Sequence, residues 1–176
     1  MRSVDFFPIK CFLTKIESYQ DILAEAILNK EKIQEVSIAQ GRTCSPNHFT
    51  DFGGTVKNKS FEENLKKALL PLVEEHKLQV DVIDYWTAFY QEGSLHEPHL
   101  HKDHIFDRCN YSGILYLTSI GGTDFFSPHN MSDQSIVTVN GTAGDVFIFP
   151  SLLPHTFAQS VQGDRVIISF NLSITG

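Results

Sequence analysis

Hydrophobic positions follow a helical period in the first half of the chain. Residues 18–36 and 60–76 both repeat apolar side chains every three or four positions, which is the spacing of one face of a helix. Ser60 and Glu63 form a capping box at the start of the second stretch. We therefore predict two helices, separated by a long loop over residues 41–60 that is rich in Gly, Ser, Asn and Thr.

The second half has the composition and turn pattern of a β protein. It is rich in β-branched and aromatic residues, and Gly-Gly, Ser-Pro, Asn-Gly and Gln-Gly pairs mark turns between short apolar runs. The predicted strands span residues 81–90, 95–101, 111–118, 123–127, 135–139, 145–149, 155–159 and 165–173, with an edge strand over residues 6–13. We predict one α+β domain over residues 1–176, mainly β, with helical support over about 1–79 and a sandwich, jelly roll or barrel over about 80–173.

Composition restricts the function classes. The chain has 176 residues, and 14 Lys plus Arg against 21 Asp plus Glu give a net charge of −7. This charge disfavours a nucleic-acid partner, since such binding depends on clustered basic side chains. There is no run of about 18 apolar residues, so no membrane partner is expected. The three scattered cysteines are typical of reduced thiols, and we expect a cytoplasmic protein.

Histidine is concentrated in one place. Four of the eight histidines fall within residues 96–104: His96, His99, His101 and His104. In a strand, His99, His101 and Asp103 would share a face. His101 and Asp103 have the H-x-D spacing that, with a distant histidine such as His155, gives the 2-His-1-carboxylate set of non-haem Fe(II) enzymes. The histidines outside the cluster and its distant partner are expected to be solvated surface groups: His48, His76 and His129.

Arg165 stands at the start of a strongly apolar strand, ten residues after His155. A buried guanidinium needs a partner, and the residues that share its face in that strand include no acid. An arginine fork is suited to bidentate capture of a carboxylate. A cosubstrate that carries a carboxylate is one candidate partner, with Ser169 as an added donor. An acidic residue elsewhere in the fold is the alternative.

Several motifs together resemble a known family, the Fe(II)/2-oxoglutarate-dependent dioxygenases, and within it the prolyl-hydroxylase-like branch. The motifs are the H-x-D pair, Tyr-Ser-Gly-Ile-Leu-Tyr-Leu at 111–117, Gly-Gly-Thr-Asp-Phe-Phe at 121–126, Gly-Asp-Val-Phe-Ile-Phe-Pro at 144–150, Pro-His at 154–155, and Arg165. The likeness covers about residues 80–173, and the motifs are specific only in combination.

The resemblance implies a fold, cofactors and site residues. The fold is a double-stranded β-helix, or jelly roll, with the N-terminal helices packed on one side. The implied ligands to Fe(II) are His101, Asp103 and His155. The cosubstrate 2-oxoglutarate would be anchored through its distal carboxylate by Arg165 beside Tyr116, with Tyr90 as a further cosubstrate contact. With O2, such an enzyme hydroxylates a C–H group of a peptidyl, prolyl-like substrate or of a small molecule.

Alternatives stay open at this point. Gly93 lies six residues before His99, a spacing that the family shows before its first ligand, so His99 with His101 is an alternate ligand pair. Residues 93–101 and 144–155 also resemble cupins, which share the barrel, so a cosubstrate-independent dioxygenase or an isomerase is a rival function. A non-catalytic jelly-roll binding module is a second rival.

Overall fold

The computed structural model describes residues 9–41, 47–94, 96–101, 109–128, 136–157 and 163–176. The helices are α1 (Tyr19–Leu28), α2 (Lys30–Gln40) and α3 (Lys59–His76). The strands are β1 (Phe12–Lys15), β2 (His48–Thr50), β3 (Gln79–Tyr90), β4 (Tyr111–Tyr116), β5 (Thr123–Phe126), β6 (Ile136–Val139), β7 (Asp145–Pro150), β8 (His155–Phe157) and β9 (Arg165–Thr175). None of the helices in these ranges is long and apolar enough to cross a membrane.

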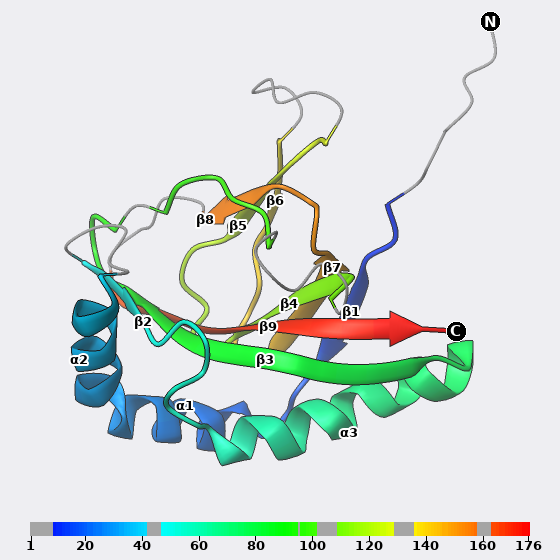
Figure 1. Ribbon diagram of the computed structural model, residues 1–176, viewed down its shortest axis with the longest axis horizontal. Helices are drawn as coiled ribbons and strands as arrows, with labels where there is room; N and C mark the ends of the chain where they lie inside the picture. Colours follow the sequence, from blue (N-terminus) through cyan, green and yellow to red (C-terminus); the bar gives the residue numbers. More distant parts are fainter. Residues whose placement is uncertain (1–8, 42–46, 95, 102–108, 129–135, 158–162) are drawn as a thin grey trace, which may run out of the picture.

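The strands form two antiparallel sheets. The large sheet has six strands in the order β1-β7-β4-β9-β3-β2, and the small sheet has three in the order β6-β5-β8. Figure 1 shows the helices along one face of the large sheet and the small sheet over its other face. A mainly β fold with helices on one side is thus confirmed.

Strand β9 separates the two apolar layers of the molecule, because successive side chains of a strand point to opposite faces. One row packs with the helices in the larger core: Val166, Ile168, Phe170, Leu172 and Ile174. The other row faces the small sheet and lines a cavity between the sheets: Arg165, Ile167, Ser169 and Asn171. The apolar row anchors the strand, since fully burying one such side chain stabilises the fold by about 1.5–3 kcal/mol.

Strand β3 contains a bulge that changes which residues face the cavity. Val82 pairs with Leu172, but Asp84, rather than Ile83, pairs with Asn171. A bulge inserts one residue and re-aims the side chains that follow it. As a result Val82 packs with the helical core, whereas Asp84 lies beside Asn171.

The first predicted helix is two helices, so the expectation of one helix over residues 18–36 was wrong. Asn29 separates α1 from α2, with φ −94° and ψ 4°. Its side-chain Nδ2 donates to the Glu25 carbonyl oxygen at 2.9 Å. Asparagine competes for backbone groups in this way, and the apolar period alone does not reveal such a break.

The N-cap of α3 is Asn58, so the predicted capping box at Ser60 and Glu63 was wrong. Asn58 Oδ1 accepts from the Phe61 N–H at 2.9 Å, and its Nδ2 donates to the Ile22 carbonyl oxygen at 3.0 Å. The buried Asn58 therefore caps α3 and also ties it to α1, which a capping serine at position 60 could not do.

Most predicted strands are confirmed to within two residues at their described ends; residues 135 and 158–159 of two predicted strands lie outside the described part. The described part of 95–101 forms a loop with one isolated bridge, between His99 and His155, so a strand there was wrong. The expected edge strand is β1, which begins later than predicted; residues 6–8 lie outside the described part. The expected loop over 41–60 contains strand β2.

Candidate metal and cosubstrate site

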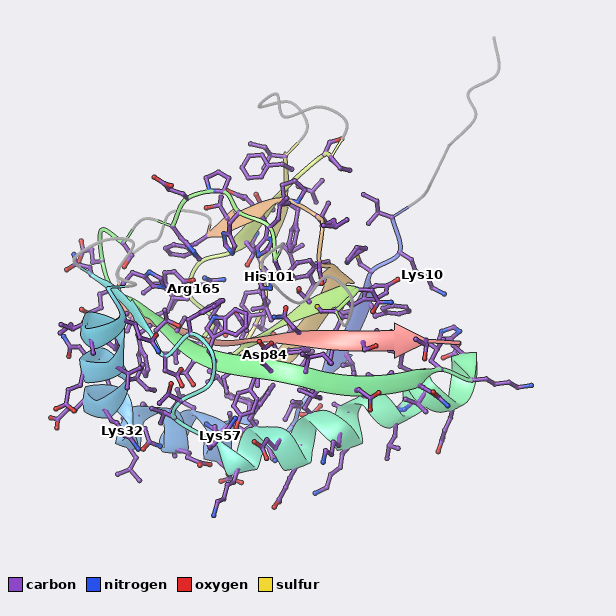
Figure 2. The ribbon with its side chains drawn as sticks, viewed as in Figure 1. Lys10, Lys32, Lys57, Asp84, His101 and Arg165 are labelled. Atoms are coloured by element: carbon purple, nitrogen blue, oxygen red, sulfur yellow. The ribbon has the colours of Figure 1, made fainter. Side chains whose placement is uncertain are left out.

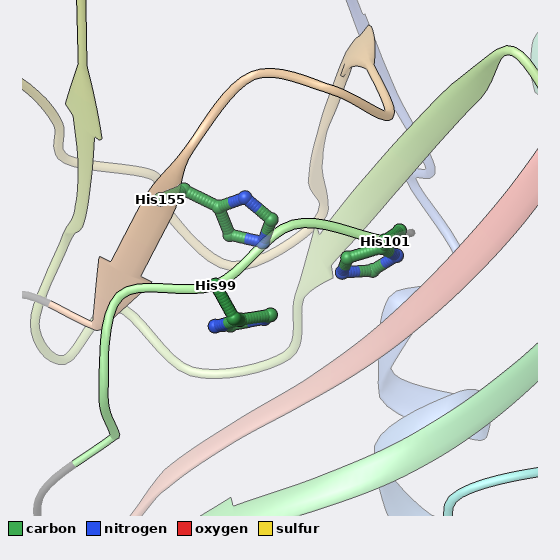
Figure 3. Close-up of side chains that lie close together, drawn as sticks. All are labelled: His99, His101 and His155. Carbon is green, nitrogen blue, oxygen red and sulfur yellow. The ribbon is translucent and has the colours of Figure 1, made fainter. Parts of the chain in front are cut away.

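Three histidines meet between the two sheets. One potential ligand atom from each of His99, His101 and His155 lies within 4.8 Å of those of the other two, and Figure 3 shows the three imidazoles facing one another. The bridge between His99 and His155 fixes two of them through backbone hydrogen bonds of 2.9 and 3.1 Å. The backbone of His101 is fixed by its main-chain N–H, which donates to the Ser151 carbonyl oxygen at 3.1 Å.

Each of the three rings has its Nδ1 beside an oxygen acceptor. His99 Nδ1 lies 3.0 Å from the Glu97 carbonyl oxygen, and His155 Nδ1 lies 3.0 Å from the Leu153 carbonyl oxygen. His101 Nδ1 lies 2.7 Å from the Asn171 side-chain oxygen. Since these oxygens accept and do not donate, each Nδ1 carries the proton. Each Nε2 then keeps a lone pair, which is the form in which histidine binds a metal ion.

Burial also favours the uncharged form of the three imidazoles. Burial lowers the pKa of His101 to about 4, and burial lowers the pKa of His155 well below its ordinary value. Burial likewise lowers the pKa of His99. Because a metal ion displaces protons from its ligands, rings that are already neutral are prepared to bind one. The donor set therefore fits a divalent transition-metal ion.

Arg165 lies in the same cavity and is only 1% exposed. Its Nη2 donates to Thr123 Oγ1 at 2.9 Å, and its Nε has no hydrogen-bond partner in the described part of the chain. Three rings surround the guanidinium, with centroids at 5.0, 5.6 and 4.6 Å from Cζ: Tyr90, Tyr116 and Phe157. Among the described residues, no carboxylate forms an ion pair with it. Burial lowers the pKa of the guanidinium, so an anionic ligand beside it would stabilise its charge.

One cavity of about 350 Å³ joins the histidines to Arg165. Of the described residues that line it, none is Asp, Glu or Lys. Figure 2 shows His101 and Arg165 both in the space between the sheets. A cavity with one buried cation and a neutral three-histidine set favours a ligand that is an anion at the Arg165 end.

The structure brings most of the predicted site residues together. Lining the cavity are Tyr90, His99, His101, His155, Arg165 and Ser169. Tyr116 lies behind this wall, fully buried, with its hydroxyl 2.9 Å from Thr123 Oγ1, which in turn accepts from Arg165. Asp103 lies outside the described residues.

Sequence reasoning missed two histidines of the cavity wall. His48, expected at the surface, is buried and stacks on Tyr90 with ring centroids 4.4 Å apart. His96 stacks on His99 at 4.2 Å, and its Nδ1 lies 3.1 Å from the Tyr90 hydroxyl. No local pattern marks His48, because strand β2 has only three residues and follows an aperiodic stretch. His76 is exposed as expected, and His129 lies outside the described part.

Comparison with solved structures confirms the expected resemblance at the level of the fold. A prolyl-4-hydroxylase from Pseudomonas putida shares 17% identity over 94% of this chain and 93% of its own, with a TM-score of 0.61. The viral collagen prolyl hydroxylase of Paramecium Bursaria Chlorella virus-1, solved with 2-oxoglutarate, shares 16% over 92% and 95%, with a TM-score of 0.56. HygX from Streptomyces hygroscopicus, solved with nickel, 2-oxoglutarate and hygromycin B, shares 12% over 94% and 83%, with a TM-score of 0.59.

Sequence comparison adds nothing to this likeness: the chain matches no protein-family model and none of the curated proteins. At identities of 11–17% the solved structures establish a shared fold. The chemistry must be argued from the cavity itself.

Proposed function

We propose that this chain is a single-domain Fe(II)- and 2-oxoglutarate-dependent oxygenase, and that its two sheets form a double-stranded β-helix. One observation carries the proposal. A cluster of three histidines and a buried arginine that pairs with no carboxylate of the described residues line the same cavity, in a fold shared with oxygenases of this kind. A metal ion and a dicarboxylate would satisfy the two groups together.

His99, His101 and His155 would hold the iron through Nε2. When bound, Fe(II) supplies the activation of O2 that oxidises a C–H bond. The residues of the chain do the positioning: the Nδ1 contacts fix the three rings, and the bridge between His99 and His155 fixes their separation. The H-x-D register, with His101, Asp103 and His155 as ligands, is the competing assignment.

Arg165 would bind the distal carboxylate of 2-oxoglutarate. The surrounding rings shield the guanidinium from water, and its Nε has no partner among the described residues. A charge-assisted hydrogen bond is strong in such a water-poor environment. Thr123 Oγ1 accepts a hydrogen bond from the guanidinium of Arg165, and the Tyr116 hydroxyl is hydrogen-bonded to the same Thr123 oxygen. Tyr90 and Ser169 complete the wall toward the histidines, with Ser169 as an added donor.

The substrate would enter past an aromatic wall. Trp86 lies beside His101, with ring centroids 5.4 Å apart, and Phe52 contacts Trp86 at 4.7 Å. Phe52 is 39% exposed, which places it at the mouth of the cavity. Such a wall suits an uncharged C–H group of a peptidyl, prolyl-like residue or of a small molecule.

Turnover of the cosubstrate tests the proposal. Metal-depleted protein, supplied with Fe(II), O2 and 2-oxoglutarate, should release succinate, and His155→Ala should abolish both iron binding and succinate release. His76→Ala is the matched control, because His76 is exposed and lies outside the cavity. Iron binding without any effect of 2-oxoglutarate would favour the cupin-type function, and a wild-type protein that binds no metal would favour the binding module; either result contradicts the proposal.

The same preparation decides the ligand register. If His99 is a ligand, His99→Ala loses iron while Asp103→Ala keeps it. If the H-x-D pair holds the metal, the two variants behave in the opposite way. Iron content by metal analysis gives the answer without dependence on a substrate.

A further inference from the structure

We propose that Asp84 and Asn171 are positioning residues that fix the metal-binding tautomer of His101. The inference rests on the proposed function only in taking His101 as a ligand. It concerns a chain of hydrogen bonds that begins at a carboxylate on β3 and ends at the ring of His101. Figure 2 labels the two ends of this chain, Asp84 and His101.

The chain has two links. Asn171 Nδ2 donates to Asp84 Oδ1 at 2.8 Å, and Asn171 Oδ1 lies 2.7 Å from His101 Nδ1. Asn171 is 3% exposed, so water does not compete for its amide. Both contacts are within the range of good hydrogen bonds.

The direction of the chain follows from its first member. An ionised carboxylate accepts and cannot donate, so Asp84 requires the NH2 group of Asn171 on its side. The amide oxygen of Asn171 must then face His101, whose Nδ1 must carry the proton. Nε2 of His101 is then left with a lone pair that can bind a metal ion. A carboxylate two side chains away thus determines which nitrogen can bind a metal.

The other partners of Asn171 cannot set this direction. Ser112 Oγ also donates to Asn171 Oδ1, at 2.8 Å, and lies 2.9 Å from Ser151 Oγ. Ser151 Oγ in turn lies 3.0 Å from Cys109 Sγ. Hydroxyl and thiol groups can rotate to donate or accept, so this branch adapts to either orientation of the amide. Asp84 is the member of the network with a fixed role.

The contact between Asp84 and Asn171 depends on the β-bulge in β3. The bulge in β3 brings Asp84, rather than Ile83, opposite Asn171. Without the inserted residue, the apolar Ile83 would stand at that position and the amide would have no acceptor. Bulges that re-aim a side chain are common next to active sites.

The contact also supplies charge where the described ligands have none. Three neutral imidazoles leave the full double charge of a bound metal ion uncompensated. The Asp84 carboxylate, coupled through the amide to His101, makes that imidazole a stronger donor, as second-shell carboxylates do for metal-bound histidines. Such partners typically change metal affinity 10–100-fold when mutated.

The test combines the affinity for a metal ion with a measurement of the tautomer of His101. Asp84→Asn removes the fixed acceptor and lets the amide of Asn171 reverse, so the Kd for Co(II), measured on metal-depleted protein, should rise about 10–100-fold. Asp81→Asn is the matched control, with the same change of charge on an exposed side chain of the same strand; its Kd should equal that of the wild type.

A double variant that restores Co(II) affinity distinguishes a positioning role of Asp84 from a merely structural one. In the double variant Asp84→Asn/Asn171→Asp the carboxylate stands directly beside His101 Nδ1, so the proton is again held there and Co(II) affinity should return toward the wild-type value. In parallel, 15N NMR of histidine-labelled, metal-free protein should show the Nδ1–H tautomer of His101 in the wild type and in the double variant, and the other tautomer or a mixture in Asp84→Asn.

Two results would overturn the inference. One is a Co(II) affinity of Asp84→Asn equal to that of Asp81→Asn; the other is a wild-type His101 that carries its proton on Nε2. The second needs no variant to fold. If the wild type binds no Co(II) while His101 shows the Nδ1–H tautomer, the proposed function fails and the positioning of His101 stands.

Discussion

Replacing Arg165 with Met has separate effects on the free energy of unfolding and on the affinity for 2-oxoglutarate. In the protein alone, Arg165 is 1% exposed, its Nε has no hydrogen-bond partner, and no carboxylate of the described residues pairs with it. Exchange of buried ionic groups for apolar residues of similar volume is often neutral or stabilising by about 1–4 kcal/mol. We therefore expect the free energy of unfolding of cosubstrate-free Arg165→Met to equal or exceed that of the wild type.

The effect on binding has the opposite sign. Truncating one member of a buried, hydrogen-bonded charge pair costs about 2–5 kcal/mol. With a factor of ten for every 1.4 kcal/mol, the Kd for 2-oxoglutarate should rise roughly 30- to 4,000-fold. Binding of the metal ion, which depends on the histidines, should be unchanged.

Urea unfolding measures the first effect, and calorimetric titration of 2-oxoglutarate into Co(II)-loaded protein measures the second. Arg165→Lys is the control: it keeps the charge but lacks the fork, so its Kd should fall between those of the wild type and Arg165→Met. The reasoning is refuted if Arg165→Met loses several kcal/mol of stability and binds 2-oxoglutarate as the wild type does, because Arg165 would then be a structural cation.

Three further substitutions test the surroundings of the site. Gly141→Ala would place a Cβ 2.2 Å from the ring of the buried Tyr116; we expect about 1–3 kcal/mol of lost stability in urea unfolding, together with weaker 2-oxoglutarate binding, and wild-type values for both would contradict the packing. His48→Phe removes two buried ring nitrogens that have no hydrogen-bond partner among the described residues while keeping a flat ring; thermal unfolding should show a gain of about 1–2 kcal/mol, and a loss would mean that these nitrogens are satisfied. Asn58→Ala removes the cap of α3 and should cost about 1–2 kcal/mol, with the helix signal in circular dichroism retained; no change in the unfolding midpoint would count against the cap.

The strands could be predicted because their signals are local. The Asn140-Gly141 turn pair precedes β7, and the β-branched and aromatic content of β7 favours a strand. His155 and Arg165 could be predicted for the same reason, since each begins a strand whose limits are visible in the sequence. Their side-chain directions then follow from the period of two.

What could not be predicted depends on contacts between distant segments. The direction of His99 is set by its bridge to His155, 56 residues away (155 − 99), rather than by a strand of its own. Asp84 reaches Asn171 only because of the bulge, and nothing in the local sequence marks Ile83 as the inserted residue. His48 has no periodic neighbours, so its burial in the cavity is visible only once β2 pairs with β3.

Calorimetric titration of 2-oxoglutarate with and without Co(II) shows whether the histidines and Arg165 form one site. We predict that Co(II) tightens 2-oxoglutarate binding, and that 2-oxoglutarate tightens Co(II) binding by the same factor, as linkage requires of ligands that share a site. His155→Ala should abolish the coupling, while its Arg165 still binds 2-oxoglutarate weakly. Equal affinity for 2-oxoglutarate in the presence and absence of the metal would contradict a shared site.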